Sequence, residues 1–258
     1  MSTALITGAS KGIGKAIAEE LAKRKTDVLL IARSEDLLKE TAASLSSTYG
    51  IKADYLTIDL SKEGAAKKIF DWCAEKNYSI NILINNAGYG LSGHFEDHSL
   101  EEHIGVMQVN MNVIVELCFY FLPMLREHDK SYILNITSTT SFQAVPGLNI
   151  YAASKAFLQS FSRGFRYELR NTNVSVTVAC PGSTDTDFAN RAKVGDKVLK
   201  AAKTFNMAPA DVAEAAITAM YSKKAETTIG TLNKINKFLV WLVPKKLSER
   251  VAGNIYDV

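Results

Sequence analysis

Short apolar runs of strand length alternate along the whole chain with longer segments of helical periodicity. The strands are rich in β-branched residues and do not alternate with polar ones, which indicates that helices cover both faces of the sheet. The expected strands are residues 4–7, 28–32, 54–58, 80–85, 132–137, 174–179 and, with a weaker pattern, 226–229. The expected helices are residues 11–24, 35–48, 62–75, 100–127, 151–170 and 209–222.

This alternation predicts an α/β fold, with a doubly wound parallel β-sheet of about seven strands between two layers of helices. No linker, low-complexity segment or internal repeat divides the 258 residues, of which 47% are hydrophobic. We therefore expect one domain over residues 1–258. Ligands of such sheets bind beyond the carboxyl ends of the strands. Residues with polar or turn character follow five predicted strands there, namely Gly8, Asp59, Asn86, Ser138 and Pro181.

Charge and cysteine content narrow the class of protein. The net charge is +3 with acidic and basic residues interleaved, which is no nucleic-acid-binding footprint. Cys73, Cys118 and Cys180 are scattered within apolar runs, as buried thiols in a reducing compartment are. The first strand begins by about residue 3, which leaves no room for a signal peptide, and no stretch approaches the ~20 apolar residues of a membrane span. We expect a cytoplasmic protein without a transmembrane segment.

The first strand runs into a glycine-containing turn, T-G-A-S-K-G-I-G, and then into an amphipathic helix. Glycine lets the backbone approach a ligand closely, and the N–H groups at a helix N-terminus attract anions. Gly8, Gly12 and Gly14 therefore predict a cradle for the pyrophosphate of a dinucleotide. Their spacing, G-x-x-x-G-x-G, differs from the commoner G-x-G-x-x-G. Glycines that only make a tight turn are the alternative at this point.

A second motif lies near the middle of the chain, where Ser138 precedes the pair Tyr151 and Lys155 by thirteen residues. Residues four apart share one face of a helix, so the phenol and the ammonium can act together. An adjacent ammonium lowers the pKa of a phenol, which makes the tyrosine a usable general acid or base. Taken alone, a Tyr-x-x-x-Lys pair is more often a chance arrangement on a helix surface.

Together these residues resemble the short-chain dehydrogenase/reductase family, in its classical branch. Further motifs of that family recur in order: D-L at Asp59 and Leu60, N-N-A-G at residues 85–88, an asparagine at Asn110 in V-M-Q-V-N-M-N, and P-G-x-x-x-T from Pro181 to Thr186. The resemblance covers nearly the whole chain and implies a Rossmann-like fold with a nicotinamide cofactor.

The resemblance also implies the roles of individual residues. Tyr151 would give a proton to a carbonyl oxygen held by Ser138, while Lys155 binds the nicotinamide ribose and lowers the pKa of Tyr151. Asn110 would position a water that links Lys155 to solvent, which completes a catalytic set of Asn110, Ser138, Tyr151 and Lys155. The implied cofactor-binding residues are Gly8, Ser10, Lys11, Gly12, Ile13, Gly14, Arg33, Asp59, Leu60, Asn86, Ala87, Gly88, Tyr151, Lys155, Pro181, Gly182, Thr184 and Thr186.

The end of the second predicted strand bears on the cofactor. An acidic residue there suits the 2′-hydroxyl of NAD, whereas a 2′-phosphate favours arginine or lysine. The chain has Ala32 where the acidic residue would stand, Arg33 next to it, and Lys11 in the glycine turn. We expect NADP(H), with an ordinary solvated charge as the alternative for Arg33.

Two segments after the sixth strand are distinctive. Residues 183–208 predict a mobile substrate lid with helical periodicity in its second half, where Val194, Val198, Leu199, Ala202 and Phe205 are apolar. Lys193, Lys197, Lys200 and Lys203 form a basic stripe in this lid, which is either a solvated face or a dock for an acidic acyl carrier. Residues 231–258 form an apolar extension in which residues 238–243 are flanked by lysines. It is expected to pack against the lid or a partner subunit, with a membrane interface as the alternative.

These patterns favour an NADP(H)-dependent oxidoreductase that interconverts a ketone or aldehyde and an alcohol, on a substrate that is hydrophobic or linked to an acyl carrier. The alternative is a catalytically inactive NADP-binding regulator, or a peripheral membrane protein on the same fold. His94, His98 and His103 cluster among acidic residues, but they follow a glycine-rich loop, so we expect no metal site. By analogy with the family, we expect a homodimer or homotetramer through helices 100–127 and 151–170.

Overall fold

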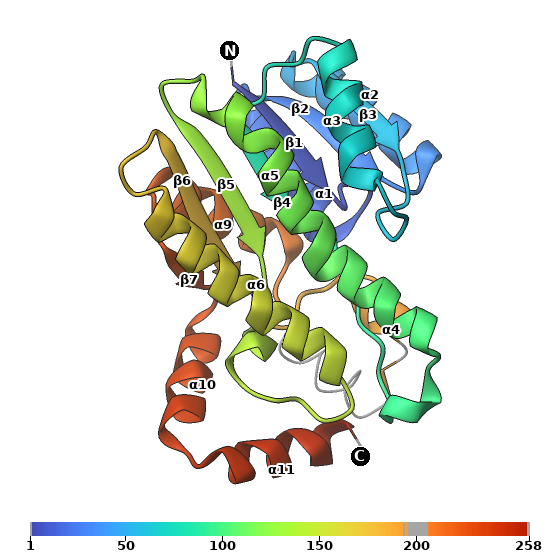
Figure 1. Cartoon of the computed structure of the whole chain (residues 1–258), viewed down its shortest axis with the longest axis vertical. Coiled ribbons are helices and arrows are strands. Elements are labelled where there is room, and N and C mark those ends of the chain that lie inside the picture. Colours follow the sequence, from blue (N-terminus) through green and yellow to red (C-terminus); the bar gives the residue numbers. More distant parts are fainter. Residues whose placement is uncertain (1, 193, 196–205, 257–258) are drawn as a thin grey trace.

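A seven-stranded, wholly parallel β-sheet forms the centre of the molecule (Figure 1), in a computed structural model that describes residues 2–192, 194–195 and 206–256. The strand order is β3-β2-β1-β4-β5-β6-β7. The strands are β1 (Thr3–Thr7), β2 (Asp27–Ala32), β3 (Ala53–Thr57), β4 (Ile82–Asn85), β5 (Ser131–Ile136), β6 (Val174–Cys180) and β7 (Glu226–Thr228). The predicted doubly wound sheet and its seven strands are confirmed. The prediction of one domain over the whole chain stays a prediction.

Helices cover both faces of this sheet, in three layers (Figure 1). One face packs against α1 (Gly12–Lys23), α2 (Glu35–Tyr49) and α9 (Pro209–Tyr221). The other packs against α3 (Ala65–Glu75), α5 (Val113–Arg126) and α6 (Asn149–Glu168). The shorter elements are η1 (Phe95–Asp97), α4 (Leu100–Met107), the π turn η2 (Gln108–Asn112), η3 (Thr139–Phe142) and α7 (Phe188–Arg191).

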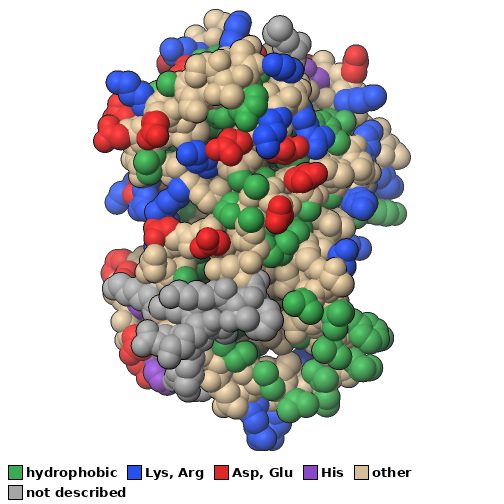
Figure 2. Space-filling view, turned by 180° about the vertical axis from the view of Figure 1, so that it is seen from behind, with side chains coloured by type: hydrophobic (Ala, Val, Ile, Leu, Met, Phe, Trp, Pro, Cys, Tyr) green, Lys and Arg blue, Asp and Glu red, His purple; other side chains and the backbone are tan. Residues whose placement is uncertain are grey.

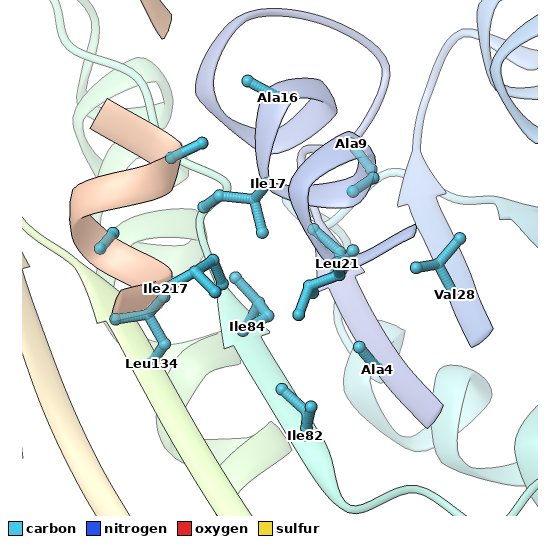
Figure 3. Packing of buried hydrophobic residues seen from close by; sticks show 14 of the residues in the cluster. Ala4, Ala9, Ala16, Ile17, Leu21, Val28, Ile82, Ile84, Leu134 and Ile217 are labelled. Atoms are coloured by element: carbon cyan, nitrogen blue, oxygen red, sulfur yellow. The ribbon is translucent and has the colours of Figure 1, made fainter. Parts of the chain in front are cut away.

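Successive residues of one strand enter opposite cores. In β1, Ala4 and Ile6 point into the cluster under α1 and α9, whereas Leu5 points into the cluster under α5. Figure 3 shows the first cluster, where Ile17 and Leu21 of α1 meet Ile84 of β4. Because both faces are dry, most positions of a central strand are apolar. This is the physical origin of the unalternating apolar runs in the sequence. The buried exceptions Asn85 and Asn135 bond to each other, Nδ2 of Asn85 donating to Oδ1 of Asn135 at 2.8 Å.

Among the described residues, one helix is long and apolar enough to cross a membrane by length and composition alone, Leu100–Arg126. It consists of α4, the π turn and α5, and 44% of its most apolar window is buried in the protein. Its inner side chains, such as Leu117 and Phe121, belong to the core cluster beneath the sheet. A core helix of a globular protein passes the same test, so we assign this helix to the core.

The structure differs most from the sequence-based predictions in the segments after β6. Residues 231–258, expected only as an apolar extension, contain two helices, α10 (Thr231–Leu242) and α11 (Lys245–Tyr256). This C-terminal helix pair lies beyond the carboxyl edge of the sheet, as α10 and α11 at the bottom of Figure 1 show. In the predicted lid, α7 is a single turn. Val194, the first apolar residue of the periodicity predicted for the lid's second half, is buried. The other apolar positions of that pattern and the basic stripe of Lys193, Lys197, Lys200 and Lys203 lie outside the described residues.

Candidate functional site

A cavity of about 680 Å³ opens at the carboxyl edge of the sheet, between the strand ends and the segments that follow β6. This volume suits a dinucleotide with a small substrate, because ligand sites commonly measure ~300–1,000 Å³. Of all the site residues predicted from the sequence, Gly14 and Asn110 alone do not line it. The predicted residues that do are Gly8, Ser10, Lys11, Gly12, Ile13, Arg33, Asp59, Leu60, Asn86, Ala87, Gly88, Ser138, Tyr151, Lys155, Pro181, Gly182, Thr184 and Thr186.

The glycine turn joins β1 to α1 at the floor of this cavity. Gly8 has φ +68°, a left-handed conformation that favours glycine, and a Cβ there would lie 2.9 Å from the Cα of Ala87. A Cβ on Gly14 would overlap the carbonyl oxygen of Gly8, so Gly14 closes the turn from behind and does not face the ligand. No side chain caps the N-terminus of α1. Its first N–H groups are therefore available to an anion in the cavity, and the turn fits a pyrophosphate.

Asn86 and Thr7 hold this turn in place. The Nδ2 group of Asn86 donates to the carbonyl oxygens of Thr7 at 2.9 Å and of Gly8 at 3.2 Å. The Thr7 hydroxyl in turn accepts from the backbone N–H groups of Asn86 and Ala87, at 3.0 and 3.1 Å. These bonds tie the end of β1 to the end of β4. The side chain of Asn86, predicted to bind the cofactor, is thus used within the protein to shape the cradle.

Tyr151 and Ser138 come from neighbouring elements of the same edge. Ser138 follows β5 in an extended conformation, and its hydroxyl accepts from the N–H of Thr140 at 3.2 Å. Tyr151 lies in the first turn of α6 and is 8% exposed. Burial raises the pKa of the Tyr151 phenol, and a hydrogen bond with Ser138 opposes that effect. The sequence predicts a pKa below the ordinary value for Tyr151, but in the structure burial of the phenol outweighs the effects that lower its pKa.

Lys155 lies one turn along the same helix and is 3% exposed. Its ammonium donates to the carbonyl oxygen of Ile136 at 3.0 Å and lies 5.6 Å from the centre of the Tyr151 ring. Burial lowers the pKa of Lys155 to about 8. Gly88 makes room for it, since a Cβ there would be 3.0 Å from the ammonium nitrogen. Tyr151, Lys155 and Ser138 thus meet in the cavity that the glycine turn enters.

Asn110 lies behind this group, in the π turn that interrupts the long helix. Its Nδ2 donates to the carbonyl oxygen of Tyr89 and to the hydroxyl of Ser154, both at 2.9 Å, and its Oδ1 accepts from the N–H of Tyr89 at 3.1 Å. The side chain is therefore occupied by bonds within the protein. It fixes the loop after β4 against α6, and the water-positioning role stays a prediction.

Two arginines and an aspartate gather at the other end of the cavity. Burial favours a higher pKa for Asp59, but hydrogen bonds from Ser61, together with the charge of Arg33, outweigh it and lower that pKa. Arg191, at the end of α7, lies over the ring of Tyr89 with 4.1 Å between the guanidinium carbon and the ring centre. Burial and the nearby Arg33 lower the pKa of Arg191. Arg33 and Arg191 therefore give this end a positive field.

The loop after β6 closes over the glycine turn. The Thr184 hydroxyl donates to the carbonyl oxygen of Gly182 at 3.1 Å, and the Thr186 hydroxyl accepts from the N–H of Phe188 at 3.3 Å. A Cβ on Gly12 would meet the methyl carbon of Thr186 at 2.9 Å. Lys11, predicted to meet the cofactor, forms an ion pair with Asp187. The Lys11–Asp187 pair and the contact of Thr186 with Gly12 hold the loop against the glycine turn.

An apolar wall beside Tyr151 was not found from the sequence. Phe188 of α7 lies 4.9 Å from Tyr151 between ring centres, and Ala252 and Tyr256 of α11 complete the cluster. Ile255 also lines the cavity. The spacing of Asp187 and Arg191 on one helical face was a usable signal for α7. The contact of α11 with Tyr151 had none, because about a hundred residues separate them.

Two of the three clustered histidines, His98 and His103, contact backbone carbonyl groups. His98 Nε2 contacts the carbonyl oxygen of Ser92 at 3.0 Å, and His103 Nε2 that of Phe95 at 2.9 Å. His103 also stacks on the ring of Phe95, 4.5 Å between centres. Within the described ranges no group of three metal-ligating side chains could hold an ion. These residues shape the loop between β4 and α4.

A glycine turn at a helix N-terminus that fits a pyrophosphate shares one cavity with Ser138 and the buried Tyr151 and Lys155, as in an oxidoreductase that uses a nicotinamide dinucleotide. Known proteins show the same relationship. The family model for short chain dehydrogenases matches residues 2–197. The chain belongs to the short-chain dehydrogenase/reductase family.

Individual relatives and structures agree with this assignment. Ketoacyl reductase HetN of Nostoc sp. is 31% identical over 242 residues, which are 93% of this chain and 82% of that protein. Hydroxysteroid dehydrogenase-like protein 1 of Gallus gallus is 34% identical over 198 residues, 75% of this chain, and the chain covers 59% of that protein's length. A short-chain dehydrogenase from Sphingobium yanoikuyae in complex with NADPH superposes with a TM-score of 0.82, at 28% identity over 95% of this chain and 96% of that chain.

Proposed function

We propose that the protein is an NADP(H)-dependent reductase or dehydrogenase that interconverts a hydrophobic ketone or aldehyde and its alcohol. The observation that carries this proposal is the meeting of Tyr151, Ser138 and Lys155 in the cavity entered by the glycine turn. Bound NADPH supplies a hydride to the carbonyl carbon. The protein's own groups hold the carbonyl oxygen and move the proton that completes the alcohol.

Tyr151 is the proton donor in this proposal. Because its pKa is raised, the phenol keeps its proton at neutral pH and can give it to the carbonyl oxygen as the C–O double bond becomes single. The Ser138 hydroxyl binds the same oxygen and orients it. Lys155, beside the ring, stabilises the phenolate left behind and returns a proton to it. In the oxidative direction the same groups run in reverse.

The test is loss of NADPH absorbance with a panel of hydrophobic ketones, aldehydes and 3-oxoacyl thioesters, for wild type and Tyr151→Phe. We expect turnover of at least one compound and a loss of roughly 10³-fold in the variant. Tyr167→Phe is a matched control, because Tyr167 lies on the same helix and is 67% exposed. Tight NADPH binding without any turnover would favour a catalytically inactive regulator instead.

The positive field around Arg33 supports NADP(H) over NAD(H) in this proposal. An arginine binds a phosphate dianion through charge-assisted hydrogen bonds that a ribose hydroxyl cannot match. We expect Arg33→Ser to lower kcat/KM for NADPH about tenfold or more and to leave that for NADH nearly unchanged. Arg24→Ser, which removes a surface arginine paired with Glu20, is the control. Equal kcat/KM values for both cofactors in the wild type would contradict the proposal.

The wall of the cavity supports a hydrophobic substrate. Tyr151 is flanked by apolar residues from α6, α7 and α11, namely Leu148, Phe188, Ile255 and Tyr256. The names of the two relatives refer to ketoacyl and hydroxysteroid compounds, both of which carry a carbonyl or alcohol on a large apolar skeleton. We also propose a homodimer or homotetramer through α5 and α6, where Phe119 and Phe157 are 75% and 37% exposed. Cytoplasmic localisation stays part of this proposal.

A further inference from the structure

The C-terminal helix α10 has the reverse of the usual side-chain distribution. None of its side chains is buried, and six large apolar ones are between 48% and 77% exposed: Leu232, Ile235, Phe238, Leu239, Trp241 and Leu242. At 100° per residue these six occupy one half of the helix. On α11, Leu247, Val251 and Ile255 add an exposed stripe at four-residue spacing. We name these nine residues the C-terminal apolar face.

The polar half of α10 is bonded to the protein body. The amide of Asn233 donates to the carbonyl oxygen of Ile229 at 2.6 Å. Lys237 pairs with Glu226 and lies 4.8 Å from the centre of the Phe142 ring. Glu226 is fixed in turn by the side-chain amide of Gln159 at 3.0 Å. These bonds fix the polar half of α10 against the protein body. The C-terminal apolar face therefore points outward.

Charge identifies the partner that fits this face. The segment from Thr231 to Tyr256 holds five basic residues and a single acidic one, Glu249, in a chain whose whole net charge is +3. Lys234, Lys245, Lys246 and Arg250 are exposed around the face. Figure 2 shows hydrophobic side chains gathered over this edge, at the lower right, with basic side chains at the lowest point. An apolar face rimmed by basic residues matches the surface of an anionic bilayer.

We propose that the C-terminal apolar face docks the protein on an anionic lipid surface. Trp241 and Phe238 lie 5.9 Å apart between ring centres and form the aromatic part of the contact, which suits the headgroup region. A second copy is the less favourable occupant, because two such faces would bring two strongly basic clusters together. The helix has twelve residues, too few to span a bilayer, so the contact is interfacial.

Docking places the cavity next to the lipid. Ile255 belongs both to the C-terminal apolar face and to the wall of the cavity, and Asn236 of α10 lines the same cavity. A hydrophobic substrate dissolved in the bilayer then reaches Tyr151 by a short apolar path. The docking surface itself does not depend on the proposed reaction, so the two can fail separately.

Sedimentation with lipid vesicles tests the proposal. The protein is mixed with vesicles of phosphatidylcholine alone, or with about a third of phosphatidylglycerol, a mixture chosen for its negative surface charge. We expect wild type to sediment with the anionic vesicles and much less with the neutral ones. Phe238→Ala with Trp241→Ala should lower the partition coefficient at least tenfold, and Lys245→Glu with Lys246→Glu should weaken it most at low salt. Leu37→Ala removes an exposed apolar residue from α2, which lies at the opposite end of the molecule from α10 and α11 (Figure 1), and should bind like wild type.

Fluorescence gives an independent reading of the same contact. The chain has two tryptophans, so Trp72→Phe leaves Trp241 as the single reporter. Trp241 is 77% exposed, and its emission should shift to shorter wavelength on anionic vesicles. No shift, or wild type remaining in the supernatant with both vesicles, overturns the proposal.

Two further outcomes assign the face to another occupant and also overturn the proposal. Self-association in sedimentation velocity that the Phe238→Ala, Trp241→Ala variant abolishes and Leu37→Ala leaves intact makes it a contact between copies. A drop of several degrees in Tm for that variant shows that another part of the chain covers the face. Carbonyl reduction is measured on the same samples without vesicles. If wild type reduces no carbonyl compound there, the proposed function is refuted and the docking proposal is unaffected.

Discussion

Helices α6 and α10 both depart from the ordinary distribution of side chains, in opposite directions. α6 buries the polar residues Tyr151, Ser154, Lys155 and Ser162, whereas α10 exposes its large apolar ones. The buried polar groups have partners inside the chain: Lys155 donates to Ile136, and Ser162 donates to the carbonyl oxygen of Leu158 at 2.6 Å. The exposed apolar groups do not pack into the core clusters.

The difference separates two kinds of exception to the rule that apolar residues lie inside. Polar residues that are buried and bonded internally mark a place where the protein acts on a bound molecule. Apolar residues that are exposed and held outward mark a place where the protein itself is bound. Both exceptions meet at the cavity, because Tyr151 and Lys155 of α6 line it together with Asn236 of α10 and with Ile255 and Tyr256 of α11.

The two inward-pointing lysines give the largest expected contrast. Lys155→Met should lower kcat by roughly 10³-fold, since it removes the charge beside Tyr151. Lys237→Met, the equivalent change on α10, should leave kcat within about twofold and lower the free energy of unfolding by about 1 kcal/mol or less. Steady-state kinetics and urea denaturation of both variants check this. Similar kcat values for the two variants would remove the distinction between the helices.

Packing should differ almost as much. Leu158 of α6 is fully buried in the core, so Leu158→Ala should cost about 2–5 kcal/mol of unfolding free energy. Leu239 of α10 is 48% exposed, and Leu239→Ala should change that free energy by about 0.5 kcal/mol or less. Urea denaturation without lipid measures both. A large cost for Leu239→Ala would mean that α10 is packed in solution.

The buried lysine should also make stability depend on pH. Folding lowers the pKa of Lys155 from 10.5 to about 8, so between these values the unfolded chain binds more protons and the folded state gains stability as pH rises. From pH 8 to 9.5 this gain should approach ~2 kcal/mol. Lys155→Met should lack it, and Lys237→Met should retain it. Denaturation curves at the two pH values decide, and a wild type less stable at the higher pH contradicts the assignment.

The smallest expected effect lies on the outer surface of α6. A Cβ on Gly164 would meet nothing within 4 Å, so Gly164→Ala should raise the free energy of unfolding by about 0.5–1 kcal/mol. Gly105 is the control, because a Cβ there would lie 2.6 Å from the Tyr89 hydroxyl, and Gly105→Ala should destabilise. Thermal unfolding of both variants measures these two changes in stability. Destabilisation by Gly164→Ala would place an unexpected partner on that side of α6.

The sequence predicted the sheet well because its information is local. Each strand was placed within two residues, since a strand covered on both faces is mostly apolar. The meeting of Gly8, Asp59, Asn86, Ser138 and Pro181 followed from the rule that parallel strands end at one edge. The place of Tyr151 and Lys155 beside them followed from the family resemblance. The π turn at Asn110 carries no local signal, and neither does the Lys11–Asp187 pair, which joins residues 176 positions apart.

The polarity of α10 shows a different limit. Its apolar residues were visible in the sequence and were expected to pack against the lid or a partner subunit. Which half of a helix faces the body is decided by partners such as Glu226 and Ile229, and these belong to β7 and the turn after it. The predicted direction of the Tyr151 pKa shift was wrong for the same reason, because the burial of the phenol depends on the assembled site.

The order of the strands has a consequence for how the protein folds during its synthesis. β1 is made first and lies inside the sheet, and each later strand pairs with one that already exists: β2 with β1, β3 with β2, β4 with the other side of β1, and so on outward to β7. Each strand that leaves the ribosome therefore finds its pairing strand already synthesised. Because α10 and α11 follow β7 in the chain, we expect nascent chains to remain in solution until the sheet is complete. Protease resistance of chains arrested after β7, before any lipid affinity develops, would record that sequence of events.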